Sequence, residues 1–150
     1  AEGFDISEAN PQLLEKNTLR LNFNSLKALK EALNNMNHKE NYCYSYFTKE
    51  FMKKNNLTVE EVTSGGKDHF LSNLVINIKD VDWGFVVYPT SDNDMWKVSF
   101  RAFRNTENVE PYARALGGGG HIRAASSTII AKAAKEVVKI VLDTISQNPS

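Results

Sequence analysis

The sequence is poor in features that mark secreted or membrane proteins. It has one cysteine, Cys43, so no disulfide can form within the chain, and a lone cysteine fits a reducing compartment such as the cytoplasm. The most apolar stretch, near the C-terminus, is interrupted by Lys135, Glu136 and Lys139, which excludes a membrane-spanning segment there. No basic start followed by an apolar run and a cleavage site is present, so we expect no signal peptide. These absences predict a soluble, cytoplasmic protein without membrane contact from this chain.

The chain also lacks an excess of either charge. Its 18 basic and 18 acidic side chains give a formal net charge of zero, which argues against a protein that coats nucleic acid through bulk charge. The distribution is uneven, however. Residues 95–126 hold five basic side chains against two acidic ones, whereas residues 1–94 hold ten against fourteen. Positive charge is therefore concentrated on the segment 95–126.

Glycine is scarce, and half of it lies in one place. Four of the eight glycines are consecutive, Gly117–Gly120 in "ALGGGGHIRAASS", and His121 and Arg123 follow. A run without Cβ atoms allows close approach of another group, and successive N–H groups form an anion-binding concavity. We expect "HIRAASS" to begin a helical turn that adds a helix N-terminus to the site. His121 and Arg123 would then donate to phosphate oxygens.

The spacing of apolar residues predicts a mixed α/β (α+β) fold, a mixed β-sheet flanked by helices. "SGGKD" at 64–68 is expected to be a turn, and Thr58 with Glu61 forms a capping box that opens a helix. Helices are expected at 18–36, 49–54, 109–116 and 131–146, the last burying Ala134, Val138, Val141 and Ile145, and strands at 42–47, 82–89 and 95–103. The segment 69–78 fits either a helix or a strand, and we favour the helix. The strands 82–89 and 95–103 are predicted to form a hairpin around "TSDND".

The strand 95–103 carries a polar row. Because side chains alternate along a strand, Lys97, Ser99 and Arg101 share one face, and Trp96 and Phe100 share the other. The polar row is either solvated or lines a site, and both interpretations stay open. Trp83 and Trp96 are expected in the core.

Other chemical signals are weak. The histidines His38, His69 and His121 have no metal-ligand spacing, so no dedicated metal site is expected. No serine lies in a Gly-x-Ser-x-Gly elbow, which disfavours a hydrolase of that type.

"ALGGGGHIRAAS", preceded by "KVSFRA", resembles the C-terminal DHH-associated domain of the DHH phosphoesterases. That family's pattern is a strand ending in Ser-hydrophobic-Arg-Ser and, after a short helix, Gly-Gly-Gly-Gly-His-x-x-Ala-Ala-Gly. The likeness covers about residues 40–150. Ala102 stands where the family usually has Ser, and Ser126 where it has Gly.

The resemblance implies a domain organisation. Residues 1–39 would be linker helices from a missing N-terminal catalytic domain, and residues 40–150 a single substrate-binding domain. Family members are Mn²⁺-dependent, and their metals lie in that N-terminal domain, so no cofactor is expected in this chain and the chain alone is expected to be inactive. No catalytic residue is assigned. The resemblance implies these substrate-binding residues: Ser99, Arg101, Gly117, Gly118, Gly119, Gly120, His121 and Arg123.

The resemblance also implies a substrate class. The first expectation is a phosphoesterase that hydrolyses short RNA oligonucleotides (nano-RNase type) or 3′-phosphoadenosine 5′-phosphate. Alternatives within the family are a cyclic dinucleotide phosphodiesterase and an exopolyphosphatase-type relative. An alternative of another class is a non-catalytic nucleic-acid-binding module, as in the C-terminal domain of alanyl-tRNA synthetases. Expected partners are short single-stranded RNA or nucleotide phosphates and the chain's own N-terminal DHH domain, and a homodimer is left open.

Overall fold

The computed structural model describes residues 22–148, in which one six-stranded sheet lies between two layers of helices. The strands are β1 (Asn37–Lys39), β2 (Tyr42–Tyr46), β3 (Trp83–Pro89), β4 (Met95–Ala102), β5 (Gly119–His121) and β6 (Ala124–Ile130). They lie in the order β1-β2-β3-β4-β6-β5, with β2 and β3 parallel and all other neighbours antiparallel. The mixed sheet and the β3–β4 hairpin are confirmed, and β1 is a strand that the sequence did not predict.

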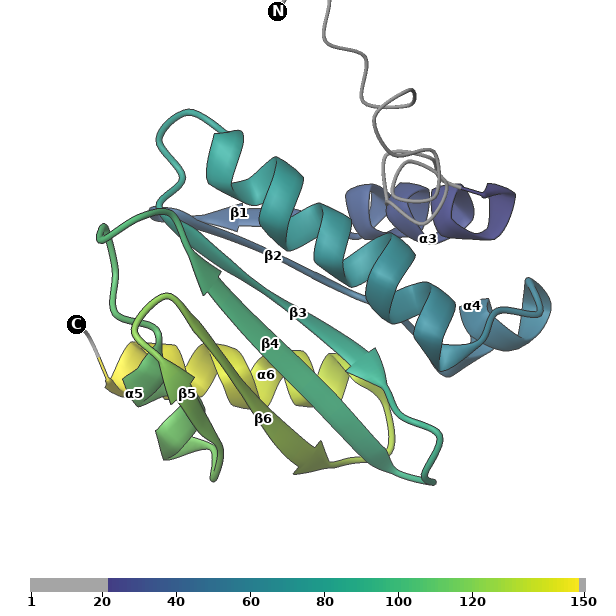
Figure 1. The fold of residues 1–150 in the computed structure, drawn as a ribbon. Helices are drawn as coiled ribbons and strands as arrows, with labels where there is room; N and C mark the ends of the chain where they lie inside the picture. Colours follow the sequence, from purple (N-terminus) through teal and green to yellow (C-terminus); the bar gives the residue numbers. More distant parts are fainter. Residues whose placement is uncertain (1–21, 149–150) are drawn as a thin grey trace, which may run out of the picture.

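Helices cover both faces of this sheet (Figure 1). A long helix over residues 59–77 and α3 (Phe23–Asn34) lie on one face, and α5 (Glu110–Ala115) and α6 (Ala134–Gln147) on the other. The short α4 (Lys49–Lys54) precedes the long helix. The long helix contains the π-helical segments η1 (Glu61–Lys67) and η2 (Phe70–Leu74) and ends in the 3₁₀ turn η3 (Val75–Asn77). No helix within 22–148 is long and apolar enough to cross a membrane.

The predicted capping box starts the long helix. The Thr58 N–H donates to Glu61 Oε1 at 2.9 Å, and the Glu61 N–H donates to Thr58 Oγ1 at 3.1 Å. The hydrogen bonds that the Glu61 carboxylate accepts, first from the Thr58 backbone, hold the pKa of this carboxyl below its ordinary value. The part of the expected first helix before residue 22, including Thr18 and Leu19, lies outside the described residues, and the domain boundary at 39/40 stays a prediction.

Two cores flank the sheet. Trp83 and Trp96 are both 1% exposed and pack with α5 and α6, as predicted, while the other face packs against α3 and the long helix. In β4 the predicted alternation holds: Trp96, Val98, Phe100 and Ala102 are buried, and Lys97, Ser99 and Arg101 are half-buried. The buried face of α6 differs from the predicted one at a single position. Val137 is fully buried, whereas Val138, which the sequence predicted to be buried, is only partly so.

The prediction of a turn at "SGGKD" is wrong, because this segment lies inside the long helix. Gly65 and Gly66 are buried under α3, where a Cβ on Gly65 would lie 2.5 Å from Ser25 Cβ. The glycines therefore allow two helices to touch rather than breaking one. On α3 it is the small residues Ser25, Ala28 and Ala32 that are buried, whereas Phe23 is 83% exposed.

The prediction of a helical turn at "HIRAASS" is also wrong. The glycines lead into β5, a turn follows, and β6 returns antiparallel to β5 and β4. Burial alternates along β6 as it does in a strand: Ala125, Ser127 and Ile129 are buried, and the residues between them are not. A methyl group on Gly118 would overlap the Ser126 carbonyl oxygen, and one on Gly120 would lie 2.6 Å from the Ala124 carbonyl oxygen. No helix N-terminus is present at this position.

The glycine run yields a matched pair of stability predictions. Gly118→Ala should lower the free energy of unfolding by about 1–3 kcal/mol, because the added methyl group meets backbone that cannot move aside. Gly119→Ala should change it by less than about 0.5 kcal/mol, because the added methyl group meets only the Glu110 carboxylate, at 3.9 Å. Urea denaturation measures both. Equal stability of the two variants would contradict this description of the hairpin.

Candidate anion-binding site

Arg101 is the central residue of the polar row. It extends from β4 toward the long helix, and its Nη1 donates to Ser72 Oγ at 3.0 Å. Its Nε is buried and has no acceptor among the described residues, and within 22–148 no carboxylate forms an ion pair with it. A buried charged donor without an acceptor is costly unless a ligand supplies the missing partner. Arg101 is therefore the strongest signal of an anion site.

A hollow of about 240 Å³ lies beside Arg101, and we call it the glycine hollow. It is lined by Lys67 and Leu71 of the long helix, Ser99, Phe100 and Arg101 of β4, Gly119 and Gly120 of β5, and Ala124, Ala125 and Ser126 of β6. Four residues implied by the sequence resemblance meet here: Ser99, Arg101, Gly119 and Gly120. Ser99 Oγ also lies 3.2 Å from the Tyr88 hydroxyl.

Lys67 is a lining residue that the sequence analysis missed. Its side chain is only 14% exposed, and its ammonium lies 2.5 Å from Asp68 Oδ1 and 5.8 Å from the centroid of the Tyr88 ring. The interpretation of "SGGKD" as a turn is the reason for the omission. One signal was available: a helix running on from the capping box at Thr58 to residue 78 would place Lys67 four residues before the buried Leu71, on the same face.

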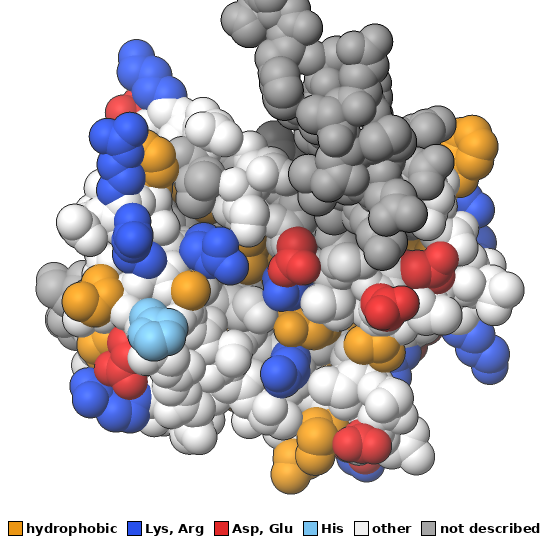
Figure 2. All heavy atoms as spheres, in the orientation of Figure 1, with side chains coloured by type: hydrophobic (Ala, Val, Ile, Leu, Met, Phe, Trp, Pro, Cys, Tyr) orange, Lys and Arg blue, Asp and Glu red, His pale blue; other side chains and the backbone are white. Residues whose placement is uncertain are grey.

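Two further hollows share Arg101. The arginine hollow, about 390 Å³, is lined by Arg101, Ala102, Phe103, Arg104, Arg123 and Ala124. The helix hollow, about 420 Å³, is lined by Ser64, Asp68, His69, Ser72, Asn73 and Arg101. Figure 2 shows Lys and Arg side chains spread over this face, which carries the long helix and the β5–β6 hairpin. Of the five basic residues that the sequence concentrates in 95–126, three line the arginine hollow: Arg101, Arg104 and Arg123.

The other candidate residues lie beside the glycine hollow, not in it. The Gly117 N–H donates to the Arg114 carbonyl at 3.0 Å, and the Gly118 N–H donates to the Ala113 carbonyl at 2.8 Å. These two N–H groups are therefore used to attach the run to α5. His121 is exposed at the end of β5, and Arg123 lies in the turn before β6, at the arginine hollow.

The described residues do not fit a metal centre. Within 22–148 no group of three or more His, Cys, Asp or Glu side chains is arranged to hold a metal ion. A Mn²⁺ ion of the kind the resemblance implies has no set of ligands in this part of the chain.

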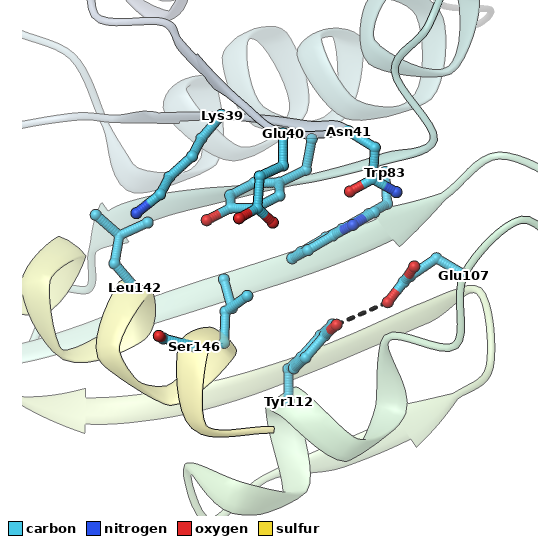
Figure 3. Close-up of a pocket in the computed structure, with 10 residues that line it drawn as sticks. Lys39, Glu40, Asn41, Trp83, Glu107, Tyr112, Leu142 and Ser146 are labelled. Carbon is cyan, nitrogen blue, oxygen red and sulfur yellow. Dashed lines mark hydrogen bonds between the residues drawn. The ribbon is translucent and has the colours of Figure 1, made fainter. Parts of the chain in front are cut away.

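A pocket of about 360 Å³ lies on the α6 side of the sheet, and its chemistry is different. Figure 3 shows Glu40 reaching it from the β1–β2 turn and Glu107 from the loop before α5, where Glu107 accepts a 2.7 Å hydrogen bond from the Tyr112 hydroxyl. The Trp83 ring is stacked with Tyr42 and Tyr112, at 4.4 and 4.9 Å between centroids. Two carboxylates and one lysine, Lys39, line this pocket, and its ring faces are already covered, so it suits a phosphate less well than the glycine hollow does.

Comparison with known proteins supports the fold alone. No family model and no curated protein matches the sequence. Among solved structures, an exopolyphosphatase-related protein from Bacteroides fragilis superposes with a TM-score of 0.73 at 20% identity, over 97% of this chain and 40% of that one. A pGpG-specific phosphodiesterase from Vibrio cholerae superposes with a TM-score of 0.52 at 9% identity, over 83% of this chain and 38% of that one.

A third similar structure is the C-Ala domain of Aquifex aeolicus alanyl-tRNA synthetase, with a TM-score of 0.49 at 16% identity, over 74% of this chain and 97% of that domain. The chain thus spans less than half the length of the first two proteins it resembles.

The Lys67–Asp68 pair makes a testable prediction about the glycine hollow. Asp68 is half-exposed, so its ion pair with Lys67 is weak and an incoming anion can displace it. Asp68→Asn should raise the affinity for inorganic phosphate by about two- to fivefold, the size of a partly exposed ion pair. Lys67→Met should lower it, and both are measured by NMR titration.

Asp143→Asn is the matched control, because it removes the same charge from an exposed pair with Lys139 on α6. An Asp143→Asn variant that matched the gain of Asp68→Asn would show that the effect is one of overall charge and not of Lys67.

Proposed function

We propose that this chain is the substrate-binding part of a DHH-type phosphoesterase and holds a phosphate group of a short RNA oligonucleotide or of 3′-phosphoadenosine 5′-phosphate. One observation carries the proposal: the guanidinium of Arg101 has a buried Nε without an acceptor in the described residues, at the edge of a hollow lined by Gly119 and Gly120. Phosphate oxygens supply the acceptors and the negative charge that this group lacks.

The surroundings of Arg101 suit the same ligand. The ammonium of Lys67 and the hydroxyl of Ser99 reach the glycine hollow from two different elements, and the glycines leave the β5 backbone uncovered by side chains. Donors carried by a helix and a strand converge on the same hollow, which is an arrangement that favours charge stabilisation.

The comparisons add support at the level of fold. An exopolyphosphatase-related protein and a pGpG-specific phosphodiesterase contain regions with this fold, and both names refer to phosphate chemistry. Because this chain spans 40% and 38% of those proteins, the proposal for residues 22–148 is binding, and the bond-breaking groups are proposed to belong to the remainder of the whole protein.

The test uses adenosine 3′,5′-bisphosphate and calorimetric titration of the 150-residue chain. Arg101→Met should weaken binding by about tenfold or more, because a hydrogen-bonded ion pair is worth about 1.5–3 kcal/mol. The same variant should unfold at an equal or higher temperature without ligand, because it removes a buried donor that has no acceptor in the described residues. A purely structural Arg101 would lower the unfolding temperature instead.

Arg114→Met is the matched control, because Arg114 is an exposed arginine on α5 that pairs with Glu110. It should leave the affinity unchanged. Equal affinities of the wild-type chain and Arg101→Met would overturn the proposed function.

A further inference from the structure

The arginine hollow is a second basic site, and the proposed function does not use it. Three arginines line it, from β4 (Arg101), from the loop after β4 (Arg104) and from the β5–β6 turn (Arg123). Its other lining residues are Ala102, Phe103 and Ala124, so the described lining contains no carboxylate. Ala102 packs into the core beside α5 and α6, and Ala124 is the small residue that pairs with Arg101 across the sheet.

Backbone hydrogen bonds hold the segments that carry these arginines. The Phe103 N–H donates to the Asp82 carbonyl at 2.8 Å, and the Thr106 hydroxyl donates to the same carbonyl at 2.9 Å. The Ala102 N–H donates to the Arg123 carbonyl at 2.9 Å, which fixes the β5–β6 turn beside the end of β4. The arrangement of the three residues is therefore set by the fold, although the side chains of Arg104 and Arg123 are exposed.

Arg104 also offers a flat surface. Its guanidinium lies over the ring of Phe103, 4.9 Å from the centroid, and this contact accompanies a left-handed backbone conformation of Arg104, with φ of 53°. A guanidinium supported on one face by an aromatic ring can stack against a nucleobase on its other face. Inorganic polyphosphate has no group that would use such a surface.

We infer that the arginine hollow is a second phosphate subsite, which takes the neighbouring phosphate of a short single-stranded oligonucleotide whose first phosphate lies in the glycine hollow. The inference rests on the proposed function, since Arg101 lines both hollows and links the two subsites. A ligand with one phosphate, such as AMP, can occupy only one of the two subsites, whereas an oligonucleotide presents a phosphate to each of them.

The test compares a 5′-phosphorylated tetraribonucleotide with AMP, each titrated against the 150-residue chain at several salt concentrations. The double variant Arg104→Ala/Arg123→Ala should weaken tetranucleotide binding about five- to tenfold and leave the affinity for AMP unchanged. The slope of log affinity against log salt should become shallower by about 0.7 for each phosphate of the single strand that the double variant no longer neutralises.

Lys53→Ala/Lys54→Ala is the control, since it removes two exposed positive charges from α4. It should leave both affinities unchanged. All four replaced side chains are exposed, and circular dichroism checks that both variants stay folded.

The outcomes separate this inference from the proposed function. A tetranucleotide affinity that depends on Arg101 but not on Arg104 and Arg123 overturns the second subsite alone. Equal losses for AMP and the tetranucleotide also overturn it, because the arginines would then act only through overall charge. Inorganic polyphosphate that binds as tightly as the tetranucleotide, with the same dependence on Arg104, overturns the choice of an oligonucleotide. Binding of both ligands that is independent of Arg101 overturns the proposed function as well.

Discussion

The half-buried Arg101, whose Nε is buried without an acceptor in the described residues, is the constraint on which the site depends. Arg101 points from β4 to the helix face of the sheet, where Ser72 accepts one of its hydrogen bonds and its Nε has no acceptor within 22–148. Burying such a group opposes folding, so the surrounding elements must offset its cost. The two apolar cores and the central position of β4, between β3 and β6, provide that stability. The site is thus built on an internal strand of the sheet.

Glycines act here mainly by permitting contact between backbones. Gly65 and Gly66 let the long helix lie against α3, and Gly118 and Gly120 let the chain cross close to β6. The first pair belongs to the helix that carries Lys67, and the second belongs to the hairpin beside Arg101. Within the run Gly117–Gly120, the N–H groups of the first two bind α5 and the last two residues line the hollow. A single motif therefore has a structural half and a half that faces the ligand site.

Charge is separated between the two faces of a neutral chain. The face covered by the long helix carries four basic residues that line the hollows: Lys67, Arg101, Arg104 and Arg123. On the α6 face, the pocket is lined by two carboxylates, those of Glu40 and Glu107. Burial raises the pKa of the Tyr42 hydroxyl in that pocket to about 12, so it stays neutral over the ordinary pH range. The basic hollows therefore attract an anion more strongly than the pocket with the two carboxylates, although the net charge of the whole chain is zero.

The sequence by itself determined the local features. Alternation in β4 placed Ser99 and Arg101 on one face, the capping box located the start of the long helix, and the turn "TSDND" predicted the β3–β4 hairpin. Only the tertiary structure decided that Gly117–Gly120 lead into a strand, that "SGGKD" lies within a helix, and that Lys67 and Arg104 join Arg101. The physical reason is the separation along the sequence of the residues that decide each feature. Alternation and capping are set by neighbours along the chain, whereas a glycine's conformation and a lysine's partners are set by backbone that packs against them from distant segments.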